Sequence, residues 1–455
     1  MGELDERAHF SADQKMLASR ALRRRSLLQR AWSSMPAFAD DVVSEVPNLR
    51  PAFSHVPAGR NHLFVPGPVN IHENVIRAMH VGGQNHRDAW FADFYKKSLE
   101  ESKMIFNTTA GTPIFYPGTG TGGWESALTN TLSPGDKVVT FRYGMFSHLW
   151  IDMMQRMGLE VEVIDCRWGD GADEEKLAEV LAKDTEKKIK AVCVVHNETT
   201  TGVTSDIGEV RKTMDSKSHP ALLLVDGVSS IGALDFQFDK WRVDVAVTGS
   251  QKALSLPTGL AVICVSDKAI EASKTAKSKR CYFDWADMLR TNPSGNVPYT
   301  PETQMLYGLR ESLKMMREEG GMTAVAARHH RLAEGTRKAV EGWGLKLLCK
   351  DPRWYSDSLT VVEVPEGIDS QKIVDIAYGK YNLSLGIGLD KVKGKVFRIG
   401  HLGNMDELML GGALCGVEMV LKDAGVPITI GSGISKATEY WRQTAKPIPT
   451  RETLL

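Results

Sequence analysis

One lysine of this sequence stands where an amine can act as a nucleophile. Lys252 closes the segment Thr248-Gly-Ser-Gln-Lys252, which directly follows the apolar run 243–248. A lysine is normally solvated at the surface. At the end of a buried strand its ammonium loses water, and this desolvation lowers the pKa of the amine toward the range of a nucleophile. Lys252 is therefore the candidate for an imine with a carbonyl compound.

Two other loops carry complementary groups. Asp226 ends the apolar run 221–226, where a carboxylate either caps the next turn or serves a function. The segment Gly118-Thr-Gly-Thr-Gly-Gly-Trp-Glu125 leads into the helical run 126–132. Its glycines let the backbone approach an anion, and the helix N-terminus adds a favourable dipole. Alone this segment is a weak signal, because it lacks the Gly-Lys-Ser/Thr ending of a P-loop.

Together, the three loops match one cofactor, pyridoxal phosphate. Lys252 would form the imine with its aldehyde. Asp226 would keep the pyridine nitrogen protonated, so that the ring withdraws electrons, and the glycine-rich loop would hold the phosphate. The three features in this order are more specific than any one of them, and they predict an enzyme that holds pyridoxal phosphate.

These loops must be positioned by a sheet. Between residues 135 and 266, short runs rich in Val, Ile, Leu and Ala alternate with stretches long enough for a helix. Such runs predict strands that are buried on both faces, as in a mostly parallel sheet of the α/β class. The expected strands are 137–141, 161–165, 189–196, 221–226, 243–248 and 260–265. Ligands of these sheets bind at the carboxyl ends of the strands, where Asp226 and Lys252 lie.

The pattern changes after about residue 320. The expected helices are 322–343, 370–381 and 407–424, and the expected strands are 345–349, 359–364 and 396–399. Mixed short elements predict a smaller α+β domain. We therefore divide the chain into an N-terminal extension (1–58), a large cofactor-binding domain (59–320) and a small C-terminal domain with a tail (321–455).

Composition narrows the class of protein. The 455 residues carry a formal net charge of zero, and 42% are apolar and 25% charged. This is ordinary for a globular protein and does not favour nucleic acid or a membrane as a partner. No apolar run reaches the roughly 20 residues of a membrane span. The six cysteines have neither C-x-x-C nor metal-ligand spacing, so no disulfide framework and no metal site are expected.

Six segments of the chain resemble a known family. They are 61–71, 119–136, 195–203, 220–230, 248–259 and 396–404. The sequence resembles the class V, fold-type I pyridoxal-phosphate aminotransferases of the alanine–glyoxylate and serine–glyoxylate group, most closely the plant-type serine–glyoxylate enzymes. The resemblance implies a mostly parallel seven-stranded sheet with helices on both faces, followed by a smaller C-terminal α+β domain.

The resemblance also implies roles for residues. Lys252 would be the Schiff-base lysine and proton carrier, and Asp226 would pair with the pyridinium nitrogen. Arg398 would bind the substrate α-carboxylate, a task that suits a planar guanidinium, and Gly67 would line the substrate pocket. Further cofactor contacts are implied for Thr119, Gly120, Thr121 and Gln251 at the phosphate, Thr199 at the phenolic oxygen, and Phe146 stacked on the ring.

Relatives of this kind are homodimers with shared active sites. Tyr299-Thr300 resembles the stretch that reaches the neighbour's cofactor phosphate, with Thr300 as the expected donor. Two positions depart from the pattern. Phe146 stands where some relatives stack Trp, and Asn296-Val-Pro298 stands where relatives carry an aromatic cluster. Whether an aromatic residue of the partner completes the site is therefore open.

The expected reaction moves the amino group of L-serine, or of L-alanine, to glyoxylate. It gives glycine and hydroxypyruvate (or pyruvate) by a ping-pong route through an imine at Lys252, in glyoxylate metabolism or photorespiration. No second arginine is evident for an ω-carboxylate, which favours small substrates, but the preferred donor (serine, alanine or asparagine) stays open.

Two other functions remain as alternatives. A cysteine desulfurase of the same fold would carry His in place of Phe146 and of Gln251, and a catalytic cysteine on a mobile loop. A binding protein that kept the fold without the chemistry is the second alternative, against which the intact Lys252, Asp226 and Arg398 argue.

The location of the protein is predicted from the extension. Residues 16–39 contain five arginines and no acidic residue, as in an organellar transit peptide or a solvated basic arm. The C-terminal residues 451–455 differ from the S-K-L peroxisomal address. We expect a mitochondrial location, with the peroxisome of many relatives as the alternative.

Overall fold

The computed structural model describes residues 59–447. The predicted targeting segment and the last residues of the tail lie outside this range. Residues 61–447 belong to one compact unit, and the division into domains at residue 320 stays a prediction. Within residues 59–447, no helix combines the length and the apolar character needed to cross a bilayer.

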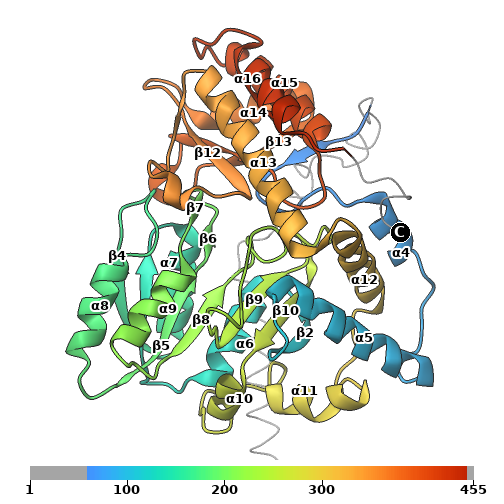
Figure 1. The fold of residues 1–455 in the computed structure, drawn as a ribbon, viewed down its shortest axis with the longest axis vertical. Coiled ribbons are helices and arrows are strands. Elements are labelled where there is room, and N and C mark those ends of the chain that lie inside the picture. Colours follow the sequence, from blue (N-terminus) through green and yellow to red (C-terminus); the bar gives the residue numbers. More distant parts are fainter. Residues whose placement is uncertain (1–58, 448–455) are drawn as a thin grey trace, which may run out of the picture. The chain divides into compact units, whose positions relative to one another are not determined.

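A seven-stranded sheet with the order β2-β10-β9-β8-β5-β3-β4 holds the loops of interest (Figure 1). Strands β4, β3, β5, β8 and β9 pair in parallel, whereas β10 is antiparallel to both of its neighbours. The strands are β2 (Thr112–Gly118), β3 (Lys137–Arg142), β4 (Glu160–Asp165), β5 (Ile189–Val195), β8 (Leu222–Asp226), β9 (Val245–Gly249) and β10 (Gly259–Val265). The predicted mostly parallel sheet is confirmed.

Helices cover this sheet because its central strands are apolar along their whole length. All five residues of β8 and all five of β9 are buried, which requires cover on both faces. The helices around it are α4 (Glu73–Met79), α5 (Ala89–Phe106), α6 (Gly120–Thr131), α7 (Met145–Arg156), α8 (Glu174–Lys183), α9 (Ile207–Ser216), α10 (Asp267–Ser273), α11 (Trp285–Thr291) and α12 (Thr303–Glu318).

A second sheet of five strands has the order β1-β13-β14-β12-β11. Its strands are β1 (His62–Phe64), β11 (Lys346–Leu347), β12 (Leu359–Glu363), β13 (Leu383–Ile387) and β14 (Val396–Gly400). Helices α14 (Ser370–Tyr381), α15 (Glu407–Asp423) and α16 (Ser432–Thr444) pack with it, drawn in orange and red in Figure 1. The blue β1 arrow lies beside β13, with which it pairs in parallel.

One long helix belongs to both cores. In α13 (Gly321–Gly342), Met322 and Val325 pack in the core of the large sheet, whereas Leu332 and Val340 pack in the core of the second sheet.

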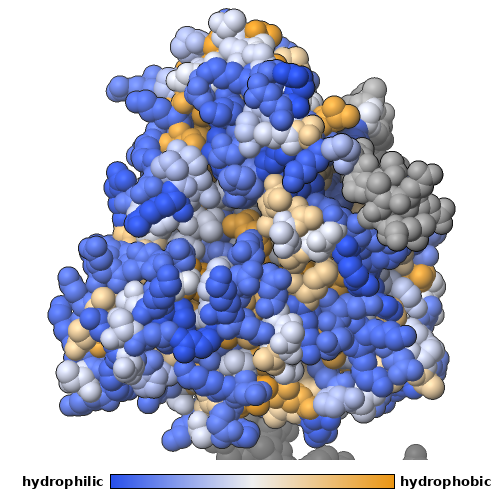
Figure 2. Space-filling view, in the orientation of Figure 1, coloured by the Kyte–Doolittle hydropathy of each residue, from blue (hydrophilic) through white to orange (hydrophobic). Residues whose placement is uncertain are grey.

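The face of the protein in Figure 2 is mainly hydrophilic, with apolar side chains in small scattered groups. The largest fully buried side chains, among them Trp150, Trp285 and Phe397, lie in the two cores.

Candidate active site

The predicted functional loops follow four strands at one edge of the large sheet. β2 runs in the same direction as β9, because each pairs antiparallel with β10. Residues 119–121 follow β2, residues 196–201 follow β5, Asp226 ends β8, and Lys252 lies in the turn after β9. Parallel strands carry these loops to the same edge, as the sequence predicted.

Lys252 is partly buried, and its side chain is closely confined. Its Nζ donates to the backbone oxygen of Pro66. A Cβ atom at Gly67 would meet Cδ, Nζ and Cε of Lys252 at 2.5, 2.6 and 2.7 Å, and the Gly67 φ of 109° also favours glycine. Gly67 therefore lies against the lysine side chain.

Burial also changes the proton affinity of Lys252. It lowers the pKa of the amine to about 8; the Arg398 guanidinium acts in the same direction, and the Asp226 carboxylate opposes it. At pH 7 about a tenth of the amine is therefore neutral, which is the nucleophilic form.

Asp226 is buried where β8 ends. Its Oδ1 accepts a hydrogen bond from the Val228 N–H at 2.8 Å. Burial raises the pKa of Asp226 to about 7, and the Val228 bond opposes this shift. A carboxylate held with so little compensation fits a cationic partner such as a protonated ring nitrogen.

The start of α6 forms a cradle of backbone N–H groups. Thr119 is the N-cap residue but makes no side-chain bond to the helix, and the first-turn N–H groups have no acceptor inside the helix. A Cβ at Gly120 would meet Cγ2 of Val228 at 2.5 Å. The glycine thus brings the helix start against the turn after Asp226, and the exposed Thr121 follows it.

Gln251 lies beside this cradle. A Cβ at Gly249 would meet Oε1 of Gln251 at 2.9 Å and the backbone nitrogen of Gly120 at 3.4 Å. Residues 119–121 and Gln251 are therefore neighbours, as a shared phosphate site requires.

Three buried polar atoms of these loops have no hydrogen-bond partner within residues 59–447. They are Oγ1 of Thr199, Oγ1 of Thr248 and Oε1 of Gln251. Leaving a polar group buried and unpaired costs about 1–3 kcal/mol, so such atoms mark a place for a polar ligand. Together with Lys252, Asp226 and the α6 cradle, they fit pyridoxal phosphate. Thr248 was not among the predicted residues.

Arg398 comes from the second sheet. It lies on β14, where its Nε donates to Ile387 O at 2.8 Å and its Nη1 to Thr199 O at 3.0 Å. These bonds fix the plane of the guanidinium. Burial lowers the pKa of Arg398 to about 10, and the Glu198 carboxylate opposes the shift, so Arg398 stays charged at neutral pH. It provides a fixed cation beside Lys252.

Glu198 is a buried residue beside the predicted site that the sequence reasoning did not single out. It is fully buried; its Oε2 accepts from Ser147 N at 2.9 Å and its Oε1 from Thr200 N at 3.0 Å. A Cβ at Gly144 would meet its Cδ at 2.2 Å. Glu198 thus fixes the start of α7. Its signal in the sequence is weaker than that of Asp226, because His196 and Asn197 separate Glu198 from the end of the apolar strand β5.

Phe146 is the second residue of α7 and is partly buried. With Thr121 and Trp124 it lines a hollow of about 480 Å³. Phe146 and Thr121 of the cradle therefore line the same hollow, and the stacking of Phe146 on the cofactor ring stays a prediction.

Thr300 is exposed between α11 and α12. The preceding Tyr299 donates to Cys281 O at 3.0 Å and to Asp287 Oδ2 at 3.2 Å, and its ring stacks on Tyr282. Contact of Thr300 with a partner's cofactor stays a prediction.

Among residues 59–447, no group of three or more His, Cys, Asp or Glu is arranged to hold a metal ion.

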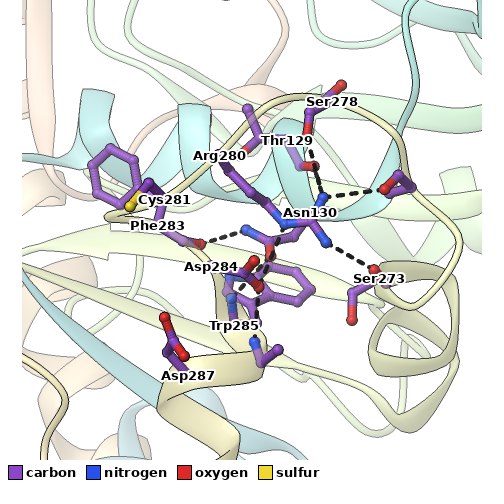
Figure 3. A network of polar contacts seen from close by, with 12 residues as sticks. Thr129, Asn130, Ser273, Ser278, Arg280, Cys281, Phe283, Asp284, Trp285 and Asp287 are labelled. Carbon is purple, nitrogen blue, oxygen red and sulfur yellow. Dashed lines mark hydrogen bonds and ion pairs between the residues drawn. The ribbon is translucent and has the colours of Figure 1, made fainter.

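The segment before Tyr299 is attached to α6 by the network in Figure 3. Asn130 Nδ2 donates to Phe283 O at 2.7 Å, and its Oδ1 accepts from Trp285 N at 3.0 Å. Arg280 Nη1 donates to Thr129 O at 3.0 Å. Tyr299 and Thr300 therefore extend from a segment held on the end of α6 opposite the cradle.

The chain is similar to named enzymes over most of its length. The profile of the family described as "Aminotransferase class-V" matches residues 69–378. The serine–glyoxylate aminotransferase of Arabidopsis thaliana is 56% identical over 394 residues, which cover 86% of this chain and 98% of that enzyme. The L-aspartate–glyoxylate aminotransferase of Paracoccus denitrificans is 48% identical over 385 residues, which cover 85% of this chain and 97% of that enzyme.

The fold of this chain is also similar to that of a solved aminotransferase structure. The crystal structure of the ureidoglycine–glyoxylate aminotransferase of Bacillus subtilis has a TM-score of 0.78 at 26% identity. The match covers 85% of this chain and 100% of that chain.

Proposed function

This chain belongs to the class-V aminotransferase family, and we propose that it transfers the amino group of L-serine to glyoxylate, giving hydroxypyruvate and glycine. The expected family, fold and aminotransferase activity are confirmed by the comparisons. The observation that supports serine as the donor is the 56% identity to the A. thaliana enzyme along 98% of its length. L-Alanine is the alternative small donor.

The cofactor of this enzyme is pyridoxal phosphate, which supplies an aldehyde for the amino group and a ring that withdraws electrons. Lys252 would hold it covalently, with Asp226 at the ring nitrogen and Phe146 against the ring face. The phosphate would lie at the α6 cradle and Gln251. The hydroxyl of Thr199, which lacks a partner among the described residues, would bond the phenolic oxygen.

Lys252 would be the group that moves the proton. Its Nζ, with a pKa lowered to about 8, can take up and release a proton near neutral pH. Contacts with Pro66 O and Gly67 confine the amine. This confinement limits the positions from which Nζ can exchange a proton with the substrate.

Arg398 would bind the α-carboxylate that the amino acid and the 2-oxo acid share. Its guanidinium is held by Ile387 O and Thr199 O, so little ordering is needed when the substrate arrives. Because both halves of a ping-pong reaction use a substrate with this group, one arginine serves donor and acceptor.

A homodimer with shared sites is part of the proposal. The exposed Thr300, on a segment attached to α6, is the group we assign to the partner's cofactor phosphate. Sedimentation of the wild-type protein and of the Thr300→Ala variant tests whether the protein forms a dimer. The affinity of the two proteins for pyridoxal phosphate tests the contact of Thr300 with the partner's cofactor. A monomer that binds the cofactor tightly would contradict this part.

A mitochondrial location is also proposed, with the peroxisome as the alternative. The support is the arginine-rich, acid-free composition of residues 16–39. Imaging a fluorescent fusion of residues 1–50 beside organelle markers decides between the two locations.

Half-reactions with single donors test the substrate. The cofactor-loaded enzyme is mixed with L-serine, L-alanine or L-aspartate, and the absorbance change of the cofactor is followed. We expect the half-reaction with L-serine to have the largest second-order rate constant of the three donors. A faster reaction with L-aspartate or L-alanine would contradict serine as the donor and leave the aminotransferase assignment intact.

A further inference from the structure

The amide of Asn197 is fully hydrogen-bonded in the interior of the protein. Asn197 is 3% exposed and starts β6 (Asn197–Glu198), so that it directly precedes Glu198 and lies two residues before Thr199. Its Nδ2 donates to Ser229 Oγ at 2.8 Å and to Ser358 Oγ at 2.9 Å. Its Oδ1 accepts from Thr204 Oγ1 at 2.8 Å and from Ser356 Oγ at 2.6 Å. Both donors and both acceptor positions of the amide are used.

These bonds join the two sheets at the active site. Ser229 follows Asp226 by three residues in the turn after β8. Ser356 and Ser358 precede β12 of the second sheet, and β12 pairs with β14 so that Val361 lies opposite Arg398. One side chain therefore links the Asp226 turn to the sheet that carries Arg398.

Backbone bonds strengthen the same junction. Ser356 N donates to Gly202 O at 3.1 Å, and His401 N donates to Ser358 O at 3.0 Å. His401 directly follows the end of β14. The segment before β12 is thus held both by the loop after β5 and by the end of the strand that carries Arg398.

An amide suits this position better than a carboxylate. Ser229 Oγ donates its only proton to the backbone oxygen of Asn197 at 2.7 Å. Toward the side chain of Asn197 it can then only accept, so a donor must face it. Aspartate would place an acceptor against that oxygen and a charge among buried neutral groups.

We propose that Asn197 is a positioning residue that fixes the distance between Arg398 and the loops carrying Asp226 and Thr199, so that the α-carboxylate site is formed before the substrate binds. This inference rests on the proposed function, since it takes Arg398 as the group that binds carboxylate. It adds the cause of that geometry, which lies in a side chain that touches neither cofactor nor substrate.

The test measures carboxylate binding by the cofactor-loaded enzyme. Acetate, an unreactive carboxylate, is titrated by calorimetry and as a competitive inhibitor against L-serine. We expect Asn197→Ala to weaken the binding of acetate and to raise the KM for both L-serine and glyoxylate, each by about tenfold. A change of this size corresponds to the loss of one or two buried hydrogen bonds. The value of kcat should stay within about twofold.

A matched variant controls for general loss of stability. Asn130 is buried like Asn197, and its amide is bonded to Ser126 O, Phe283 O and Trp285 N (Figure 3). It joins α6 to the segment around Phe283 and Trp285, and these bonds involve no strand of the second sheet. Asn130→Ala should lower Tm as Asn197→Ala does and leave acetate affinity unchanged. Equal loss of acetate affinity in both variants would overturn the proposal.

Two further variants separate the inference from the proposed function. Ser358→Ala removes one of the two serine partners that precede β12 of the second sheet. It should raise the same KM values by a smaller factor, which keeps the test available if Asn197→Ala does not fold. Arg398→Ala should abolish acetate binding. If Arg398→Ala has no effect, the proposed carboxylate role fails. If it weakens acetate and neither Asn197→Ala nor Ser358→Ala does, the positioning role alone fails.

Discussion

Arg398 donates from Nη1 to the backbone oxygen of Thr199 at 3.0 Å, although the two residues are 199 positions apart in the chain. The same Thr199 presents a buried hydroxyl without a partner among the described residues. One residue therefore contacts the arginine expected to bind the substrate and offers a free group to the cofactor. The two halves of the site meet at Thr199.

Loss of the guanidinium should affect substrate binding more than turnover. A hydrogen bond to a charged group contributes about 1.5–3 kcal/mol, so Arg398→Ala should raise the KM for L-serine and for glyoxylate by about 10–100-fold. Arg398→Lys keeps the charge but lacks the planar, two-pronged guanidinium, so its KM values should lie between those of the wild type and of Arg398→Ala. Steady-state kinetics with each substrate varied measures both. A change confined to one substrate would contradict a shared carboxylate site.

The pH dependence of cofactor attachment follows from the burial of Lys252. Its pKa is lowered from 10.5 to about 8, so the neutral amine appears as pH rises through about 8. The rate at which the cofactor-free enzyme captures pyridoxal phosphate should therefore rise with pH and level off above about 8. Stopped-flow absorbance from pH 6 to pH 11 measures this rate. A midpoint near 10.5, the ordinary value, would show that the amine is not desolvated.

Gly67 should tolerate no side chain. Gly67→Ala would place a methyl group within 2.7 Å of Lys252 Cδ, Nζ and Cε. We expect the variant to capture the cofactor poorly and to lose most of its activity. Gly344→Ala is the control, because φ is +70° there and its Cβ would meet nothing within 4 Å. Both substitutions carry backbone strain of about 1–3 kcal/mol, so similar Tm losses with unequal cofactor capture support the contact with Lys252.

The buried Glu198 should be needed for cofactor affinity. Glu198→Gln keeps one acceptor oxygen but sets an NH₂ group against a backbone N–H of Ser147 or Thr200. This should cost about 1–3 kcal/mol of stability and loosen the start of α7, which carries Phe146. The measurements are Tm and the Kd for pyridoxal phosphate. Glu175→Gln, an exposed change in the first turn of α8, should alter neither.

The chemistry-bearing loops could be predicted from the sequence because their signal is local. Asp226 and Lys252 each follow a continuous apolar run, and parallel strands place such loops at one edge. The edge strand β2 could not be found in this way. Its Pro113 and Pro117 argue against a strand, and they are tolerated because β2 is the edge of its sheet and pairs only with β10.

Contacts between distant segments escaped the sequence. The sequence predicted no strand at residues 62–64, yet β1 pairs with β13, 321 residues later. Asn197 and Glu198 were read as part of a motif, but their partners lie in the turn after β8, in the second sheet and at the start of α7. Which hydroxyl or N–H meets a side chain is set by packing, which no local pattern encodes.

Trapping the cofactor on its lysine tests the central claim most directly. The purified, cofactor-loaded enzyme is reduced with borohydride, digested and mapped by mass spectrometry. The account predicts a pyridoxyl group on Lys252 in wild-type protein, and its loss when L-serine is added before the reductant. A pyridoxyl group on another lysine, or on none, would contradict it.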